Sequence, residues 1–425
     1  MKDDASIQPL RGFRELTPEE FGKKAIVTSK AKELFRLYGY EEVEIPTLEP
    51  LNLIELKVGE EIKHRMFRFK DLSGRDVVLR PEGTISIARL MATKLKAISL
   101  PTRLSYVANM FRYDEPQRGR FREHTQVGFE LFGSGSVLAE VEILEIALRL
   151  LRQLGFKDFR VKIGHEGILR KTMSHFDVPP DKQDMLLGML DRNEWDPIKS
   201  ELRQQEKIEL LGLLERLSGL KGSEAEAIVN EAKEVLKGID GIEPLFDAFR
   251  QIIGFLHANT GNRVVVDMGF ARGLEYYTGM IFEIYVKGLE IAVAGGGRYD
   301  GLCKLFGLDI PAIGFALGVD RLVLGDEAPE AYKEAFVSLV PVTEANYEYA
   351  FEVGNELRKK GIPVITEFPA KSLSSTMEKA SKKGPKFAII IGDKEASTKT
   401  VTIKDMRSGV QEVCTIDVAV RKICG

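Results

Sequence analysis

The most informative stretch of the sequence reads Phe111-Arg-Tyr-Asp-Glu-Pro-Gln-Arg-Gly-Arg-Phe-Arg-Glu-His-Thr-Gln126 and continues Val-Gly-Phe-Glu130. We expect a strand over about 102–112 and another over about 124–132, because a charged, glycine-containing loop between two such runs is typical of an antiparallel pair. Alternation along the second strand places Gln126, Gly128 and Glu130 on one face. That face suits a small polar ligand and the nearby arginines suit a phosphate, although a half-exposed hairpin with a solvated loop fits the same residues.

Helices and further strands are predicted on both sides of this hairpin. Thr17-Pro-Glu-Glu20 is typical of a helix start, and apolar side chains then recur at helical spacing until Gly39. The other expected elements are strands at 40–45, 77–80, 264–267 and 280–285 and helices at 84–97 and 136–155. Together they indicate a mixed α/β (α+β) fold with an antiparallel sheet, built from residues 1–158 and 257–328.

Two segments differ in character from this core. Residues 159–256 contain short amphipathic patterns, such as Leu186–Leu190 and Leu210–Leu214, and we interpret them as a helical insertion domain. After a linker at Gly325–Pro329, residues 331–425 alternate strand with helix. This alternation predicts a small α/β domain with an open, mostly parallel sheet.

The composition excludes several classes of protein. Of the 425 residues, 44% are hydrophobic and 29% are charged, and the net charge is −3. The chain is therefore neither a wholly basic nucleic-acid coat protein nor an acidic disordered chain. Residues 331–425 hold 15 Lys and Arg against 12 Asp and Glu, or +3, which leaves −6 for the rest. The tail is thus the better candidate for contacting a polyanion.

Location can also be inferred from composition. The sequence has no apolar stretch long enough for a membrane span, and its N-terminus leads into no hydrophobic region of a secretion signal. The three cysteines, at positions 303, 414 and 424, form no C-x-x-C pair, which argues against a disulfide framework or a zinc knuckle. We expect a protein of the reducing cytoplasm with no membrane partner.

Several familiar catalytic signatures are absent from the sequence. It contains no G-x-x-x-x-G-K-[ST], no H-E-x-x-H and no G-x-S-x-G pattern. The five histidines, at positions 64, 124, 165, 175 and 257, lack the spacing of metal ligands. We therefore expect no metal ion held by protein side chains.

Four further segments carry candidate functional residues. Leu79-Arg-Pro-Glu-Gly-Thr84 puts a carboxylate and a hydroxyl at a strand-to-helix turn, where Thr84 also suits an ordinary helix cap. Phe270-Ala-Arg-Gly-Leu-Glu-Tyr-Tyr277 sets an arginine, a carboxylate and two phenols beside a glycine. Ala294-Gly-Gly-Gly-Arg-Tyr-Asp-Gly-Leu302 lets the backbone approach a ligand or a crossing strand. Ala312-Ile-Gly-Phe-Ala-Leu-Gly-Val-Asp-Arg321 predicts a strand, a turn and a helix, with the arginine facing solvent or a triphosphate.

As a set, these segments resemble the motifs of one enzyme family. The hairpin and Gly314–Arg321 resemble the second and third motifs of class II aminoacyl-tRNA synthetases, and the helix at 17–39 with the strand before Pro46 resembles the first. The segments ending at Tyr277 and Leu302 are similar to the two histidine-specific signatures of histidyl-tRNA synthetases. Five motifs occur in the family's order, and the resemblance covers nearly the whole chain, including an anticodon-binding domain from about 331.

The resemblance implies a role for each matching residue. Arg112 and Arg321 would hold the α- and γ-phosphates of ATP, and Arg120 would contact ATP and the acceptor end of the tRNA. Arg272 would lie against the α-phosphate and the substrate carboxylate, so that Arg112, Arg272 and Arg321 form the catalytic set. The implied histidine-binding residues are Glu82, Gly83, Thr84, Arg112, Gln126, Glu130, Arg272, Tyr276 and Tyr277. Among them Glu82, Thr84 and Gln126 would bind the α-amino group. Glu130 and Tyr277 would receive the imidazole nitrogens, with Tyr276 lining the pocket.

The resemblance also implies a reaction and its partners. L-histidine and ATP would form histidyl-adenylate and pyrophosphate, and the histidine would then pass to the terminal ribose of tRNA(His). Magnesium would bridge the ATP phosphates. No side chain need be a covalent nucleophile, so positioning and electrostatics would supply the catalysis. The first motif would form the interface of a homodimer. The sequence departs from the class pattern at Asp114 and Asp320, where the class has Glu, and this leaves their contacts to the adenine side open.

Two alternatives remain open from the sequence. One is a histidine-sensing, non-catalytic paralogue like the regulatory subunit of ATP phosphoribosyltransferase, which shares the catalytic fold but lacks the C-terminal domain. Arg112, Arg272 and Arg321 argue against it, as does the tail at 331–425. The other is a class II synthetase for threonine or proline with a similar tail, and the segment ending at Tyr277 argues against that one.

Overall fold

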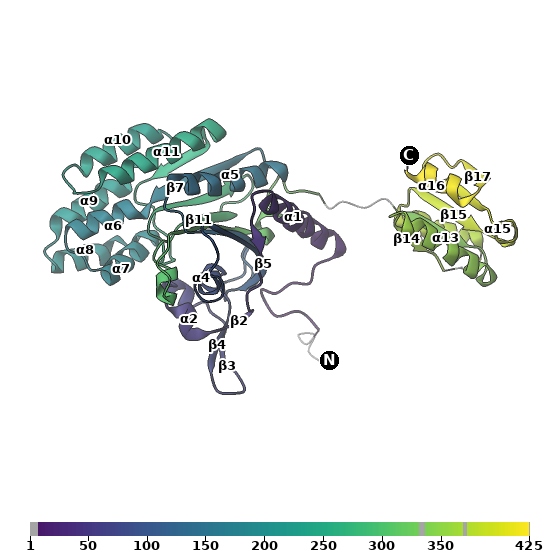
Figure 1. Ribbon diagram of the computed structural model, residues 1–425, viewed down its shortest axis with the longest axis horizontal. Coiled ribbons are helices and arrows are strands. Elements are labelled where there is room, and N and C mark those ends of the chain that lie inside the picture. The colour runs from purple at the N-terminus through teal and green to yellow at the C-terminus, as the bar shows by residue number, and fades with distance from the viewer. Residues whose placement is uncertain (1–6, 331–335, 369–371, 425) are drawn as a thin grey trace. The chain divides into compact units, whose positions relative to one another are not determined.

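The computed structural model describes residues 7–330, 336–368 and 372–424. The chain divides into two compact units, residues 1–331 and 332–425, and each is described by itself (Figure 1). Residues 331–335 and 425 of the predicted C-terminal domain lie outside the described residues.

A nine-stranded sheet is the centre of the larger unit. Within the described ranges, the β1–β5 and β7–β9 pairs are parallel and the other neighbouring strands are antiparallel. This confirms the prediction of a mixed fold around antiparallel strands. In order across the sheet the strands are β1 (Glu41–Glu42), β5 (Thr102–Phe111), β6 (Glu123–Phe132), β12 (Ala312–Gly318), β11 (Ala294–Arg298), β10 (Met280–Val286), β7 (Phe159–His165), β9 (Val264–Asp267) and β8 (Lys221–Gly222).

β5 and β6 form the predicted antiparallel hairpin. Thr102 pairs with Phe132 at one end of the two strands and Phe111 pairs with Glu123 at the other. On one face of β6, Phe129 is buried in a core that it shares with helices of the same unit. On the other face a Cβ added to Gly128 would lie 2.5 Å from the ring of Tyr106, its partner on β5, and that ring is buried in a second core. The predicted alternation along β6 is therefore confirmed.

Helices cover both faces of this sheet. α1 (Pro18–Leu37) and α5 (Val137–Gln153) pack on the Phe129 face, and α4 (Thr84–Thr93) packs on the other (Figure 1). α1 begins with the predicted cap, since Thr17 and Glu20 form a reciprocal capping box. α4 ends at Thr93, short of the predicted end at 97.

A second, three-stranded antiparallel sheet adjoins the core beside α4. The strand predicted at 77–80 lies in it, whereas the strand predicted at 40–45 is limited to the two residues of β1. Its order is β2 (Leu48–Pro50), β4 (Asp76–Leu79) and β3 (Arg68–Lys70). Two short helices, α2 (Leu51–Glu55) and α3 (Glu60–Lys63), lie between β2 and β3 in the sequence. Two others follow strands of the central sheet: η3 (Cys303–Phe306) comes after β11 and α12 (Val319–Leu322) comes after β12.

The segment predicted as a helical insertion is mostly helical but begins with a strand. Phe159–His165 forms β7 of the central sheet and pairs with β10 and β9. Its buried and exposed residues alternate, with Val161 and Ile163 buried and Arg160 exposed, which is the pattern of a half-buried strand. The helices that follow are α6 (Glu166–His175), α7 (Pro180–Asp191), α8 (Trp195–Gln204), α9 (Ile208–Gly219), α10 (Ala225–Val235), α11 (Glu243–Thr260) and η2 (Gly261–Arg263).

The C-terminal unit is a five-stranded sheet with helices. β13 pairs in parallel with β14 and β15, but β16 and β17 join antiparallel, so the prediction of a mostly parallel sheet is correct for only part of it. The strand order is β14 (Val364–Thr366), β13 (Val337–Pro341), β15 (Phe387–Ile391), β16 (Val401–Asp405) and β17 (Gln411–Cys414). The helices are η4 (Glu344–Asn346), α13 (Tyr347–Lys359), α14 (Leu373–Lys383), α15 (Asp393–Thr398) and α16 (Ile416–Cys424).

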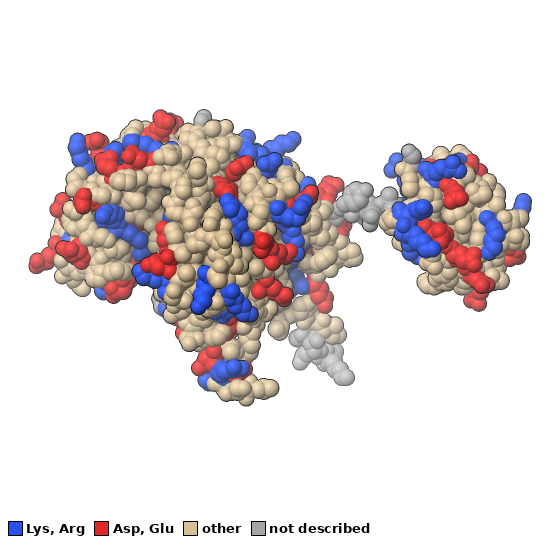
Figure 2. Space-filling view, in the orientation of Figure 1, with Lys and Arg blue, Asp and Glu red and all other residues tan. Residues whose placement is uncertain are grey.

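Charges of both signs are spread over the surface of the protein. Figure 2 shows acidic and basic side chains interspersed over the visible face of the larger unit, without a continuous field of one sign. Across the part of the chain that the structure describes, every helix is too short or too polar to cross a lipid bilayer.

Candidate active site

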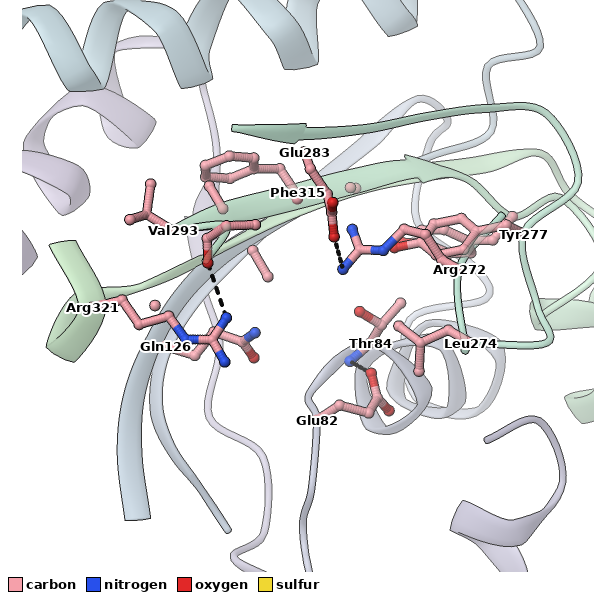
Figure 3. Close-up of a pocket in the computed structure, with 18 of the residues that line it drawn as sticks. Glu82, Thr84, Gln126, Arg272, Leu274, Tyr277, Glu283, Val293, Phe315 and Arg321 are labelled. Carbon is pink, nitrogen blue, oxygen red and sulfur yellow. Dashed lines mark hydrogen bonds and ion pairs between the residues drawn. The ribbon is translucent and has the colours of Figure 1, made fainter. Parts of the chain in front are cut away.

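A cavity lies against the central sheet, where β6, β12 and β11 are neighbours. A concave site with several convergent polar side chains is typical of small-molecule binding. Figure 3 shows Arg321 and Arg272 entering it from opposite sides, with Glu82 and Thr84 on a third. The polar residues of its wall are Glu82, Thr84, Arg112, His124, Gln126, Arg272, Tyr276, Tyr277, Glu283, Tyr299 and Arg321.

Most of the residues predicted from sequence therefore meet in one place. The structure brings together Glu82, Thr84, Arg112, Gln126, Arg272, Tyr276, Tyr277 and Arg321. Gly83, Arg120 and Glu130 are not part of the wall as described. Gly83 instead allows close packing beneath the wall, because an added Cβ would lie 2.9 Å from the ring of Tyr106.

Two arginines form a cationic end of the cavity. Arg112 follows β5, and its Nε donates a 2.7 Å hydrogen bond to the carbonyl of Pro81. Arg321 of α12 donates to the carbonyls of Gly119 at 3.0 Å and Ala292 at 2.9 Å. Burial, together with the positive charges of Arg112 and Arg120, lowers the pKa of Arg321 to about 10. Guanidinium groups gathered without enough counter-charge favour a polyanionic ligand, and arginine matches phosphate geometry.

The hairpin loop adds a third arginine behind this end. Gly119 turns the loop with a φ of +77°, which favours glycine, and Arg120 follows it. The Nε of Arg120 is buried, and within the described part of the chain it has no hydrogen-bond partner. Nearby, burial and then the charges of Arg112 and Arg321 lower the pKa of His124 to about 3, so this imidazole is neutral at physiological pH.

Glu82 caps helix α4 and closes another side of the cavity. Its carboxylate accepts hydrogen bonds from the backbone N–H groups of Thr84 at 2.8 Å and Ile85 at 2.9 Å. The alternative in which Thr84 is an ordinary helix cap is therefore wrong. The hydroxyl of Thr84 instead donates a 2.9 Å hydrogen bond to Glu130. Burial raises the pKa of Glu82, although the hydrogen bonds from Ile85 and Thr84 oppose the rise.

Glu130 lies one layer beneath the cavity wall. It is 1% exposed, and its two oxygens accept from the hydroxyls of Thr84 and Tyr299. Burial raises the pKa of Glu130 to about 8, although both hydrogen bonds oppose the rise. Tyr299 lines the cavity directly, although no role was predicted for it from the sequence. Its position one residue after β11, whose residues line the same cavity, was the signal that sequence reasoning missed.

Arg272 and two phenols form the side opposite Arg321. The guanidinium of Arg272 lies 3.7 Å from Glu283 and 5.7 Å from the ring centre of Tyr277. Tyr276 and Tyr277 are each 5% exposed, and burial raises the pKa of Tyr277 to about 12, so its phenol keeps its proton at neutral pH. Glu283 was not predicted, yet a lone carboxylate within the apolar strand β10 was a usable signal.

The run of glycines in β11 admits a crossing strand, which is one of the two purposes left open by the sequence, and also the side chain of Arg272. A Cβ on Gly295 would lie 2.1 Å from Nη1 of Arg272, and one on Gly296 would lie 2.2 Å from the carbonyl oxygen of Gly314 on the next strand. Glycine here thus admits a functional side chain and a crossing strand at once. Gly314 has the same role, because an added Cβ would lie 1.5 Å from a carboxylate oxygen of Glu130.

The two aspartates that replace class-pattern glutamates lie outside the cavity wall. Asp320 is 1% exposed, and its carboxylate pairs with Lys24 of α1 at 3.0 Å and accepts from the backbone N–H of Thr125 at 2.6 Å. Asp114 pairs with Arg65 at 3.3 Å. Both side chains therefore hold neighbouring segments against the hairpin.

The donor set of the cavity does not form a metal site of its own. Its two wall carboxylates are already engaged, Glu82 by the N-terminus of α4 and Glu283 by Arg272 and the hydroxyl of Tyr285. Among the described residues, His, Cys, Asp and Glu do not gather into a group of three or more that could hold a metal ion. A metal ion here would have to be held mainly by a ligand such as a polyphosphate.

Comparison with known proteins shows to which family the chain is similar. A family model for histidyl-tRNA synthetase matches residues 12–322, and one for an anticodon-binding domain matches residues 337–424. A histidine–tRNA ligase of Methanocaldococcus jannaschii is 37% identical over 417 residues, which are 97% of this chain and 98% of that protein. One from Sulfurisphaera tokodaii is 35% identical over 410 residues, 96% of each chain.

Solved structures share the fold. An ATP phosphoribosyltransferase regulatory subunit/histidyl-tRNA synthetase from Bacillus halodurans is 26% identical, with a TM-score of 0.73 over 91% of this chain and 97% of that one. A histidyl-tRNA synthetase from Nostoc sp. PCC 7120 is similar in fold, with a TM-score of 0.77 over 98% and 99% of the two chains at 22% identity.

The class of the protein follows from these matches, which run through both units of the chain. The chain is an aminoacyl-tRNA ligase, with a synthetase catalytic domain followed by an anticodon-binding domain. Within that class it belongs to the histidyl-tRNA synthetase family. The resemblance inferred from its motifs is confirmed.

Proposed function

We propose that the protein activates L-histidine with ATP, forming histidyl-adenylate and pyrophosphate, and then transfers the histidine to the 3′ end of tRNA(His). One observation carries the proposal: Arg112, Arg272 and Arg321 line the same cavity as Glu82 and Tyr277. Cations for a triphosphate and polar groups for an amino acid thus face one space. The name of the relatives supports the same substrate.

The cationic end would bind ATP. Arg112 and Arg321 hold its α- and γ-phosphates, and Arg120 approaches from the hairpin loop with its unpaired Nε. Burial and the neighbouring arginines lower the pKa of Arg321, and a triphosphate would supply counter-charge to this group. Magnesium would be held by the ATP phosphates and would neutralise part of their charge, while the arginines of the protein orient the nucleotide.

The opposite end would bind histidine. Glu82, with Gly83 and Thr84 on the same turn and Gln126 across from it, receives the α-amino group. Neutral imidazole has one donor and one acceptor nitrogen. The protonated phenol of Tyr277 donates to the acceptor nitrogen, and Tyr299 accepts from the other, with Tyr276 beside them. Glu130, which accepts from Tyr299, acts through that phenol and through Thr84.

Arg272 connects the two ends. It binds the carboxylate of histidine and the α-phosphate, so that the carboxylate oxygen attacks phosphorus in line and pyrophosphate leaves. Arg112 and Arg272 stabilise the charge that develops on the α-phosphate, in a site where preorganised donors need no rearrangement. The terminal ribose hydroxyl of the tRNA then attacks the acyl carbon and AMP leaves, without a covalent enzyme intermediate.

The rest of the chain would bind tRNA and a second subunit. The C-terminal unit matches an anticodon-binding domain and carries the +3 charge. The larger unit divides into a core, 1–158 and 257–328, and an insertion, 159–256, with β7 in the core's sheet. α1 exposes Phe21 and Leu37, at 61% and 64%, which supports a homodimer interface on this helix. The cytoplasm is the compartment in which these partners meet.

A second candidate function is a histidine-sensing regulatory subunit. It is kept because one similar solved structure carries both names. The arginines of the cavity and the anticodon-binding match at residues 337–424 favour catalysis.

Amino-acid-dependent exchange of pyrophosphate into ATP tests the proposal. We expect exchange with histidine and none with threonine or proline. A folded protein that binds histidine but shows no exchange would instead support the sensor, and exchange with another amino acid would overturn the assigned specificity.

A further inference from the structure

The loop that carries Arg272 and Tyr277 has little regular structure to hold it. Residues 268–279 connect β9 to β10 and belong to no helix or strand. Two further cavities adjoin the loop, one beside Arg272 to Glu275 and one beside Glu275 to Thr278. The rings of Tyr276 and Tyr277 are packed in a core, but the backbone polar groups of the loop belong to no helix or strand and must find their hydrogen-bond partners in other segments.

Helix α6 supplies two of these partners. Glu166, at its first position, accepts a 3.1 Å hydrogen bond from the backbone N–H of Arg272. Arg170, one turn later, donates from Nε to the carbonyl of Tyr277 at 2.9 Å and lies 3.5 Å from Glu166. Gly167 permits the approach, since an added Cβ would lie 2.7 Å from the carbonyl oxygen of Thr278. Both ends of the functional segment are thus fixed to one face of α6.

Helix α7 holds the arginine in place. Asp184 accepts from Nη1 of Arg170 at 2.7 Å with one oxygen and from Lys57 at 2.8 Å with the other. The side chains of Asp184 and Arg170 are 13% and 18% exposed, so their attraction is less screened than that of a surface pair. Lys57 belongs to a turn that meets the loop directly, because a Cβ on Gly59 would lie 2.5 Å from the carbonyl oxygen of Gly273.

We propose that Arg170 and Asp184 of the helical insertion are positioning residues for histidine recognition. Asp184 fixes the guanidinium of Arg170, Arg170 fixes the carbonyl of Tyr277, and the phenol of Tyr277 is thereby held over the imidazole. This inference rests on the proposed function. It assigns the insertion a role inside the active site, through a cluster that joins α6, α7 and the turn at Lys57. A displacement of the phenol weakens histidine binding, while the phosphate-binding arginines stay in place.

The test compares two variants of the cluster with a matched control in the full-length protein. Asp184→Asn keeps the shape of the side chain but removes its charge, and Arg170→Lys replaces a planar fork with a single ammonium group. The control is Glu201→Gln, because Glu201 of α8 forms an equally short 2.7 Å pair with Lys182 of α7, away from the loop. Pyrophosphate exchange is measured at varied histidine and varied ATP, and thermal unfolding is recorded for each protein.

We expect both cluster variants to raise the KM for histidine by about tenfold while the KM for ATP stays unchanged. The unfolding temperature should fall modestly, because a partly buried ion pair is weakened. The control should match the wild type in every measurement. Wild-type constants in both cluster variants would overturn the inference alone. A parallel rise of both KM values together with a lower unfolding temperature would also overturn it, because that result indicates a purely structural role. Absence of histidine-dependent exchange in the wild type would overturn the proposed function and this inference with it.

Discussion

Thr84 and Glu130, 46 residues apart in the sequence, are joined by a 2.9 Å hydrogen bond that the threonine hydroxyl donates beneath the cavity wall. The bond connects the strand-to-helix turn before α4 with the middle of β6. Because Tyr299 donates to the other carboxylate oxygen, three distant segments converge on one buried acid. Burial raises the pKa of this acid to about 8.

The pKa of Glu130 makes the stability of the protein depend on pH. Since its ordinary value is 4.5, the folded state prefers the protonated form, and the resulting stabilisation is complete below pH 4.5 and lost as pH rises through about 8. We expect the free energy of unfolding to fall over this range, and Glu130→Gln to remove on the order of 1–3 kcal/mol of the fall. Urea unfolding at several pH values measures it. Glu166, whose pKa burial also raises to about 8, contributes in the same direction and remains in the variant. Identical pH dependence in wild type and variant would contradict the prediction.

Arg272→Ala should lower kcat/KM for pyrophosphate exchange by about 10²–10³-fold, because the arginine contacts charge that develops during the reaction. Arg263→Ala is the control, since its guanidinium also lies 5.7 Å from an aromatic ring, that of Phe159, but outside the cavity. Circular dichroism checks that both variants are folded. Near-normal exchange by Arg272→Ala would remove this residue from its proposed role.

Gly314→Ala should destabilise the protein, because its Cβ would lie 1.5 Å from an oxygen of Glu130 and either β12 or the carboxylate must move. We expect a loss of about 2 kcal/mol or more in the free energy of unfolding. Gly212→Ala is the opposite case, since Gly212 is exposed within α9 and an added Cβ would meet no heavy atom within 4 Å. That change should stabilise by about 0.5–1 kcal/mol. Equal effects in urea unfolding would show that the close approach at Gly314 is unimportant.

Arg298 and Glu140 form a buried ion pair that ties β11 to α5. Nε of Arg298 lies 2.6 Å from the carboxylate, and the two side chains are 8% and 7% exposed. Glu140→Gln should cost about 3 kcal/mol of stability, because it removes the buried counter-ion of Arg298 and leaves the charge to be balanced by Asp300, at 3.1 Å. The double variant Arg298→Met with Glu140→Leu should recover part of that loss. Asp309→Asn, in the exposed pair with Lys304, should change stability by less than about 1 kcal/mol. A loss as large in this control would contradict the role of burial.

Local pattern was enough to predict much of the fold. The faces of β6 could be assigned because strand side chains alternate with period two, and the start of α1 because Thr17 and Glu20 form a local capping box. The prediction was less accurate at β7 and at the antiparallel edge of the C-terminal sheet. β7 pairs with β10 and β9, which lie about 100 residues or more later in the chain, so nothing local places it in the central sheet. β17 is a four-residue strand without a buried residue, and such a strand has little local signal of its own.

The residues of the candidate site were likewise predicted only in part. Motif residues such as Arg112, Gln126 and Tyr277 were predicted and meet at one cavity. Tyr299 and Glu283 were missed although each had a local signal, since Tyr299 directly follows the glycine-rich strand β11 and Glu283 is a lone carboxylate in the apolar strand β10. Which polar side chains reach the cavity nevertheless depends on the packing of distant strands.

By itself, the sequence determined the order of the motifs, the faces of the second hairpin strand and the family, since each depends on residue types at short, fixed spacings. Tertiary structure alone decided which polar groups reach the cavity and which support it from behind. Glu130 and Tyr299 are 169 residues apart, and Glu166 and Arg272 are 106 apart. Their contacts arise only after glycine-rich strands have packed within a few ångströms of each other, and no local pattern encodes that approach.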